Sequence, residues 1–258
     1  MGQTEKLLQK YDVEVVSLTG TYVRNPASRR VIILDGAGSC SVEEYARRHF
    51  HRLGYGALLV ENKPIRVLFS VLMWPVIQDA KDPHSRMVGF GDRHAFDAGV
   101  RGKPIWTHLP ADFGTQGYGV RRAEAIKKHL SAMNFETRQL QRLFDLWLGP
   151  SEDLRQYLCT HMNHHIEVAR QLINILPAVA IAEILRYLVD DYWGRYAGWP
   201  DLLIYRDNEF FFAEVKSVRD KLGVSQEHWI RNNHERLNFP FKLVNVVNEP
   251  GHEAVAGQ

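Results

Sequence analysis

Apolar residues recur at helical spacing over much of the 258-residue chain. Residues 41–54 begin with a serine three positions before a glutamate, a helix-capping pattern, and continue with an apolar stripe. A second stripe predicts a helix over about 63–79, and residues 118–193 read as a run of helices. Residues 81–117 are rich in Gly, His, Asp and Pro without a clear period. Long irregular stretches of this kind are often functional.

The C-terminal part instead reads as strand, strand, helix, strand. Two apolar runs, 200–205 and 210–216, are separated by four polar residues and predict a β-hairpin. A helix over 223–236 and a strand over 241–247 follow. A hairpin joined by a helix to a third strand is typical of a helix that packs on a sheet.

Together these elements predict one α/β domain with a helical insertion. Residues 1–40 contain two strand-like runs and are expected to form an N-terminal arm or edge strands. Residues 41–258 are expected to form the main domain, with the insertion over about 81–193 and the core over about 198–247. The chain shows no repeat and no low-complexity linker that would divide it further.

Composition agrees with a folded protein that is neither secreted nor membrane-bound. The hydrophobic fraction is 45% and the charged fraction 24%, both ordinary for a globular domain. Two cysteines, Cys40 and Cys159, form neither a disulfide framework nor a metal-binding pattern. No apolar run approaches a membrane span, and the first residues lack the apolar segment of a signal peptide. We therefore expect a reduced, cytosolic protein.

Candidate chemistry lies in the predicted hairpin. Asp201 precedes its first strand, and Glu214 and Lys216 close its second. The hairpin brings the two carboxylates to one end of the sheet, and residues two apart on a strand point to the same face. Two carboxylates and an ammonium group are what Mg²⁺-dependent phosphodiester cleavage requires. An exposed hairpin with a cross-strand ion pair, worth about 0–1 kcal/mol, is the alternative explanation.

The residues around this core carry a more specific pattern. It reads G-x-PDL, then EVK, then D-[RK]-L-x-x-x-Q-x-x-W-[LI], and its members are Gly198, Pro200, Asp201, Leu202, Glu214, Val215, Lys216, Asp220, Lys221, Leu222, Gln226, Trp229 and Ile230. The pattern resembles the VRR-NUC nuclease domain, a branch of the PD-(D/E)XK superfamily. That resemblance implies a restriction-endonuclease-like α/β fold, with a mixed sheet flanked by helices and a helical insertion.

A second resemblance lies upstream. Residues 42–46, 59–61 and 68–74 are similar to the nuclease module of the Fanconi-associated nuclease family. The chain departs from that family at Asn62 and Pro75, where Gly and Asp are usual. Longer family members carry an N-terminal DNA-binding module and a helical-repeat domain. The two matches cover roughly 41–247, so the chain resembles the catalytic module alone, which leaves the substrate preference open.

The resemblance also implies roles for individual residues. Lys216 would orient or activate the attacking water, and Gln226 would position that water or Lys216. The implied cofactor is Mg²⁺ or Mn²⁺. The implied metal ligands are Glu61, Asp201, Glu214 and the main-chain carbonyl of Val215. Glu61 also has a structural explanation, because an acidic residue at the start of a helix is stabilised by the helix dipole.

Basic residues offer candidate contacts to DNA. The net charge of +2 is too small to indicate nucleic-acid binding by itself, but local clusters could follow a phosphate backbone. A solvated helix face explains each cluster equally well. The candidates are Arg47, Arg48, Arg52, Arg121, Arg122, Lys127, Lys128, Arg219 and Lys221.

The expected function is therefore a metal-dependent, structure-selective DNA nuclease that cuts branched DNA such as 5′ flaps during repair. Two alternatives stay open: a dimeric four-way-junction resolvase, and a DNA-binding module with a degenerate site. The expected partner is branched or flapped DNA, with a homodimer possible in the resolvase case. The expected location is the bacterial or phage cytosol near the nucleoid, or the nucleus of a eukaryote.

Overall fold

The computed structural model describes residues 3–24, 31–36, 38–133, 135–218 and 220–249. The chain divides into two compact units. The first, here called the sheet unit, comprises Met1–Glu61 and Gly198–Gln258, and the second, the helical unit, comprises Asn62–Ala197. Each unit has its own arrangement of elements and is described separately.

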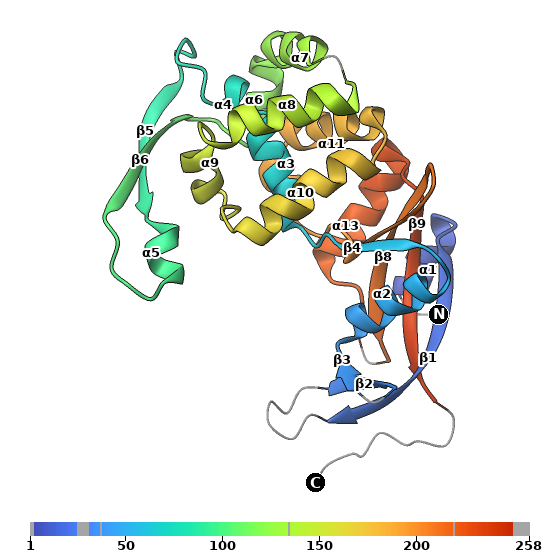
Figure 1. The fold of residues 1–258 in the computed structure, drawn as a ribbon. Coiled ribbons are helices and arrows are strands. Elements are labelled where there is room, and N and C mark those ends of the chain that lie inside the picture. Colours follow the sequence, from blue (N-terminus) through green and yellow to red (C-terminus); the bar gives the residue numbers. More distant parts are fainter. Residues whose placement is uncertain (1–2, 25–30, 37, 134, 219, 250–258) are drawn as a thin grey trace. The chain divides into compact units, whose positions relative to one another are not determined.

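The sheet unit is built on a seven-stranded mixed sheet in the order β3-β2-β1-β9-β8-β7-β4 (Figure 1). The contacts of β9 with β1 and with β8 are parallel, and the other pairs are antiparallel. This confirms the predicted mixed sheet. The strands are β1 (Glu14–Arg24), β2 (Val31–Asp35), β3 (Gly38–Cys40), β4 (Gly56–Leu59), β7 (Leu202–Arg206), β8 (Glu209–Ser217) and β9 (Phe241–Asn248).

Helices flank this sheet. Phe50 and Ala46 of α2 (Val42–Arg52) join a buried apolar cluster that includes Ala213 and Val215 of β8. Alternate residues of β8 point the other way, so Phe212 meets Trp229 of α13 (Val224–Asn232). A short helix α1 (Gln3–Lys10) precedes β1, and a π-helical turn η1 (Asn233–Leu237) follows α13. The restriction-endonuclease-like core expected from the sequence is therefore present.

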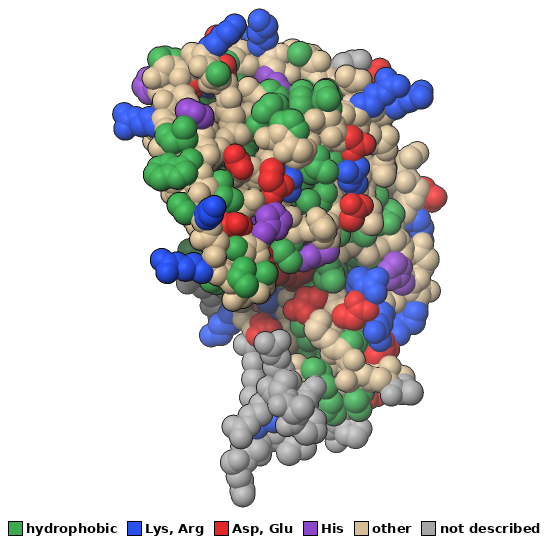
Figure 2. All heavy atoms as spheres, turned by 60° about the vertical axis from the view of Figure 1, so that its left-hand side comes forward, with side chains coloured by type: hydrophobic (Ala, Val, Ile, Leu, Met, Phe, Trp, Pro, Cys, Tyr) green, Lys and Arg blue, Asp and Glu red, His purple; other side chains and the backbone are tan. Residues whose placement is uncertain are grey.

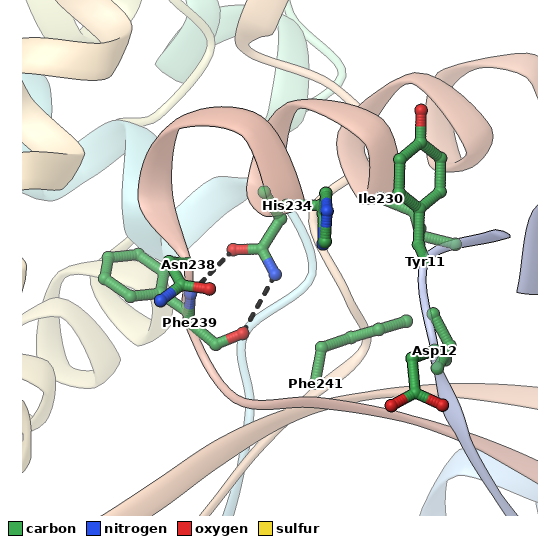
Figure 3. Close-up of a pocket in the computed structure, with 9 residues that line it drawn as sticks. Tyr11, Asp12, Ile230, His234, Asn238, Phe239 and Phe241 are labelled. Atoms are coloured by element: carbon green, nitrogen blue, oxygen red, sulfur yellow. Dashed lines mark hydrogen bonds between the residues drawn. The ribbon is translucent and has the colours of Figure 1, made fainter.

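The side chain of Asn233 holds the connection from η1 to β9 through two hydrogen bonds to the backbone. The amide of Asn233 donates to the carbonyl of Phe239 at 2.9 Å and accepts from its N–H at 3.0 Å (Figure 3). A small cavity lies beside this turn and is lined in part by Tyr11, His234 and Asn238. Its lining contains none of the predicted catalytic residues, so it is separate from the candidate site.

The helical unit surrounds α3 (Lys63–Leu72), in which every residue from Pro64 to Leu72 is buried. It contacts α8 (Thr137–Leu148), α9 (Glu152–Tyr157), α10 (Asn163–Ile175) and α11 (Ala178–Asp190). Within the described residues, no helix has the length and apolar character needed to cross a bilayer. The remaining elements are α4 (Trp74–Ile77), β5 (Ser85–Gly91), α5 (Arg93–Asp97), β6 (Pro104–Pro110), α6 (Gln116–Arg121), α7 (Ala123–Ala132) and α12 (Tyr192–Arg195).

Four features differ from the sequence expectation. The helix expected over 63–79 is interrupted at Met73, because Pro75 has no N–H to continue the helical hydrogen bonding. The helical unit already begins at Asn62, since α3 packs among helices. Residues 81–117 contain a two-stranded ribbon, β5 and β6, with α5 in its connection (Figure 1). Near the N-terminus, β1 lies inside the sheet, and β3 forms its edge.

Candidate active site

The turn that carries Asp201 depends on a glycine. Gly198 has a φ of +82°, a conformation that other residues adopt only with strain. A Cβ atom at Gly198 would lie 2.1 Å from the carbonyl oxygen of Ser225. The glycine therefore allows the first turn of α13 to approach the residues just before Asp201. Trp199, only 1% exposed, fixes the same turn by packing on Phe212 and Trp229.

Three neighbouring strands then bring the predicted carboxylates together. Leu202 pairs with Leu59 of β4 on one side and with Ala213 of β8 on the other. The N–H of Val60 donates to the carbonyl of Asp201 at 2.9 Å, and Glu61 is the next residue along the chain. A carboxylate oxygen of Asp201 accepts from the N–H of Val215 at 2.8 Å. Asp201 is thereby held next to Glu214.

Lys216 and Gln226 complete the cluster. The Lys216 ammonium lies 2.8 Å from Oε1 of Glu214 and donates to Oε1 of Gln226 at 2.9 Å. Gln226 also donates from its amide nitrogen to Glu214, and its oxygen accepts from the N–H of Gly223 at 2.8 Å. Gln226 therefore connects the start of α13 to Glu214 and Lys216 of β8. Its predicted contact with Lys216 is present.

The environment strongly disfavours negative charge on the two carboxyl groups. Burial, reinforced by the nearby Asp201, raises the pKa of Glu214 to about 8, although Lys216 opposes the shift. Burial also raises the pKa of Asp201 to about 6, against the opposing hydrogen bond from Val215. The charge of Glu61 raises the pKa of both groups. Such strongly shifted, mutually repelling carboxyl groups are common at functional sites.

The same residues fit a divalent cation. The Glu214 side chain is almost fully buried, and its Oε2 has no hydrogen-bond partner within the part of the chain that the structure describes. An unpartnered buried carboxylate oxygen is costly unless a ligand meets it. Across the described residues, no three His, Cys, Asp or Glu side chains form a ready-made metal cage. Mg²⁺ does not need one, because it commonly binds one or two carboxylates and keeps several waters.

Glu43 is a further acidic residue near the site that was not among the predicted site residues. It lies in the first turn of α2, and its charge contributes to the raised pKa of Asp201. Its neighbour Glu44 is occupied elsewhere, since it pairs with Arg47 and Arg48. The sequence feature that could have pointed to Glu43 is the acidic pair within residues 42–46, because this segment carries the upstream resemblance.

The basic residues of α2 form local ion pairs. Arg47 and Arg48 bind Glu44, and Arg48 and Arg52 bind Asp35 of β2. All three arginines keep part of their side chain in solvent. Their assignment to DNA binding stays a prediction. Glu44 and Asp35 neutralise part of the positive charge of these three arginines, so less positive charge remains to attract a phosphate.

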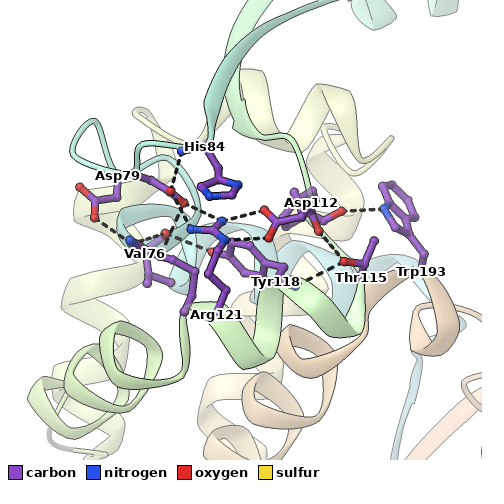
Figure 4. Close-up of polar contacts among 11 residues, drawn as sticks. Val76, Asp79, His84, Asp112, Thr115, Tyr118, Arg121 and Trp193 are labelled. Atoms are coloured by element: carbon purple, nitrogen blue, oxygen red, sulfur yellow. Dashed lines mark hydrogen bonds and ion pairs between the residues drawn. The ribbon is translucent and has the colours of Figure 1, made fainter.

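The other predicted DNA-binding residues differ in whether their charge is already paired. Arg121 is held by Asp82 and Asp112, and Arg122 by Asp79 and the carbonyl of Val76 (Figure 4). These contacts tie α6 and its end to the segment after α4, which favours a structural role over phosphate binding. Lys127 and Lys128 of α7 and Lys221 are exposed, and Arg219 lies outside the described residues. On the face drawn in Figure 2, acidic and basic side chains are intermixed.

The sheet and the juxtaposed Asp201, Glu214 and Lys216 define a restriction-endonuclease-like domain with the PD-(D/E)XK residue pattern. The comparisons with known proteins agree. Residues 136–248 match the family model of the VRR-NUC domain. This match agrees with the resemblance that the motifs between Gly198 and Ile230 indicated.

Its relatives are Fanconi-associated nucleases. The chain is 25% identical to the Fanconi-associated nuclease 1 homolog of Schizosaccharomyces pombe over 74% of its own length and 25% of that protein. It is 23% identical to Fanconi-associated nuclease 1 of Homo sapiens over 92% of its length and 23% of that protein. The chain thus spans about a quarter of the length of these relatives.

A solved structure shows the same fold. The crystal structure of paFAN1 bound to 2nt 5′flap DNA with gap superimposes with a TM-score of 0.62 at 21% identity. The match covers 93% of this chain and 38% of that one. At this level of identity, the likeness establishes the fold alone.

Proposed function

We propose that this protein is a metal-dependent, structure-selective nuclease that cuts branched DNA such as 5′ flaps in DNA repair. The observation that carries the proposal is the cluster of Asp201, Glu214 and Lys216, with one buried Glu214 oxygen lacking a partner. The Fanconi-associated relatives and the flap DNA in the paFAN1 crystal favour branched DNA as the substrate. A DNA nuclease would act at the nucleoid of a bacterium or phage-infected cell, or in a nucleus.

Asp201 and Glu214 would hold the divalent ion, Mg²⁺ or Mn²⁺, with Glu61 near enough to add its charge. When bound, such an ion stabilises charge on the phosphate and lowers the pKa of a water molecule. The ammonium group of Lys216 lies beside Glu214 and would orient the attacking water or neutralise charge on the phosphate. Gln226 limits the freedom of Lys216 through their hydrogen bond, and this is its proposed catalytic contribution.

A cleavage panel tests this function. The purified 258-residue chain is incubated with labelled 5′ flap, 3′ flap, four-way junction, single strand and plain duplex, each with Mg²⁺, Mn²⁺ or EDTA. We expect metal-dependent cuts near the 5′ flap and none in EDTA. Symmetric cuts in the junction would instead support the dimeric resolvase. Binding without cleavage under every metal would support a binding module with a degenerate site.

The carboxyl pair also predicts how pH affects stability. Its raised pKa values mean that, between about pH 4 and pH 8, the folded state holds protons that the unfolded state has already released. In EDTA, this pair should therefore make the free energy of unfolding fall as pH rises through that window. Mn²⁺ binds the deprotonated form, so its stabilising effect should be larger near pH 8 than near pH 5.5.

Thermal unfolding with Mn²⁺ or EDTA at both pH values measures this effect. Asp201→Asn is the matched variant, because an amide oxygen still accepts from Val215 but carries no charge. It should lower the pH dependence in EDTA and lose most of the Mn²⁺ shift. An equal Mn²⁺ shift in wild type and Asp201→Asn would place the metal elsewhere.

A further inference from the structure

The ribbon of β5 and β6 has one packed face and one open face. Strand register places Met87 opposite His108 and Gly89 opposite Trp106. Alternation along the strands turns these residues outward, whereas Thr107 and Leu109 are buried. Phe90 packs on Tyr157 of α9 from the inner side. Within the helical unit, one face of the ribbon therefore packs toward the helices and the other does not (Figure 1).

The outer face exposes a large aromatic side chain in a defined position. Trp106 is 61% exposed and Met87 53% exposed. A Cβ atom added to Gly89 would lie 2.9, 3.0 and 3.1 Å from three successive ring carbons of Trp106. These three distances are nearly equal, so the Cβ position lies above the face of the ring. A Cβ atom in the plane of the ring would be much closer to one ring carbon than to its two neighbours. Gly89 thus allows one indole face to lie against the strand and leaves the opposite face to solvent.

The same segment carries basic charge. Residues 85–110 contain four arginines or lysines and two aspartates. Both aspartates are used internally: Asp92 caps α5 by accepting from the N–H of Ala95, and Asp97 bonds to His161. Arg101 and Lys103 lie in the connection between the two strands and are exposed. Arg86 is exposed too, but it pairs with the buried Leu109 and therefore belongs to the packed face. The ribbon therefore combines an open aromatic face with net positive charge, a combination suited to single-stranded nucleic acid.

We propose that the outer face of this ribbon binds an unpaired nucleic-acid strand, with a base stacked on Trp106 and phosphates beside Arg101 and Lys103 of the connection between the strands. The unpaired strand is favoured over duplex because paired bases already have their faces covered by their neighbours. The inference deepens the proposed function, since a flap or branch supplies an unpaired strand. It assigns to the ribbon a binding step that does not involve the carboxylate cluster.

Binding in EDTA tests the proposal without any cleavage. Fluorescence anisotropy is measured with the full chain, a labelled single strand of about 15 nucleotides, and a duplex of the same sequence. Trp106→Ala should weaken single-strand binding about tenfold or more, the effect of losing one stacked base. Trp106→Phe, which keeps a smaller ring, should fall between the two, and duplex binding should change little. Leu146→Ala, at another exposed apolar residue of the same unit, should bind like wild type.

The results separate this inference from the nuclease assignment. Equal single-strand affinity of wild type and Trp106→Ala would overturn the ribbon proposal, whether or not the protein cleaves DNA. A loss of binding in Trp106→Ala would support it, even if the wild type cut nothing in the substrate panel. Reduced self-association of Trp106→Ala with unchanged DNA binding would assign the face to a second copy of the chain and overturn the proposal as well.

Discussion

Replacing Lys216 with alanine should reduce the rate of DNA cleavage about 100- to 1,000-fold, the usual effect of removing one preorganised charge donor from an active site. The ammonium group lies 2.8 Å from Glu214 and is held by Gln226, so its position at the carboxylates is defined before substrate binds. Gln226→Ala should have a smaller effect in the same direction, because it loosens Lys216 without removing it.

Single-turnover cleavage of a 5′ flap at saturating Mg²⁺ measures this effect. Lys242→Ala is the matched control, since Lys242 lies on the neighbouring strand β9 and pairs with Glu14 at the surface. It should cut at the wild-type rate. Wild-type turnover by folded Lys216→Ala protein would remove Lys216 from the mechanism and weaken the nuclease assignment.

Replacing Arg121 with alanine should destabilise the helical unit by about 3–5 kcal/mol, the cost of removing one partner from a buried ion pair. The side chain of Asp82 is fully buried and receives both a 2.8 Å and a 3.1 Å hydrogen bond from Arg121. Its remaining cationic neighbour, Arg122, lies 3.7 Å away. The Arg121 guanidinium also holds the pKa of Asp112 below its usual range.

Urea unfolding monitored by circular dichroism measures this loss. The exposed Arg142 of α8 provides the control, and Arg142→Ala should change stability little. The double variant Arg121→Ala with Asp82→Asn should recover part of the stability, because it removes the stranded charge. If Arg121→Ala were as stable as wild type but bound DNA more weakly, the arginine would belong to the DNA-contacting surface after all.

Several features of the candidate active site could be predicted from the sequence, because they depend on residues that are close together in the chain. The hairpin followed from two apolar runs around a polar turn, and the two-residue spacing of Glu214 and Lys216 put both on one face. Gln226 followed from its place in the family pattern, and it contacts Lys216. Short-range geometry of this kind is set by backbone periodicity, which any one segment carries in itself.

The basic residues show the limit of that reasoning. Arg121 and Lys127 looked alike in the sequence. Arg121 meets Asp112 of the preceding turn and Asp82 of a more distant segment, whereas Lys127 is exposed. A cluster of positive charge in sequence does not reveal which guanidinium groups are already neutralised. That depends on partners whose approach is set by the packing of several elements.

Periodicity and spacing within single segments predicted the hairpin, its neighbouring helix and the juxtaposition of Asp201, Glu214 and Lys216. The mixed sheet was implied by the resemblance of the local motifs to the PD-(D/E)XK pattern. The packing of distant segments, in contrast, places α3 in the helical unit, lets the charge of Glu43 raise the pKa of Asp201, and leaves Trp106 exposed on a ribbon. Each of these depends on contacts between segments far apart in the chain. Burial and charge at a position come from all its neighbours together, so no single segment specifies them.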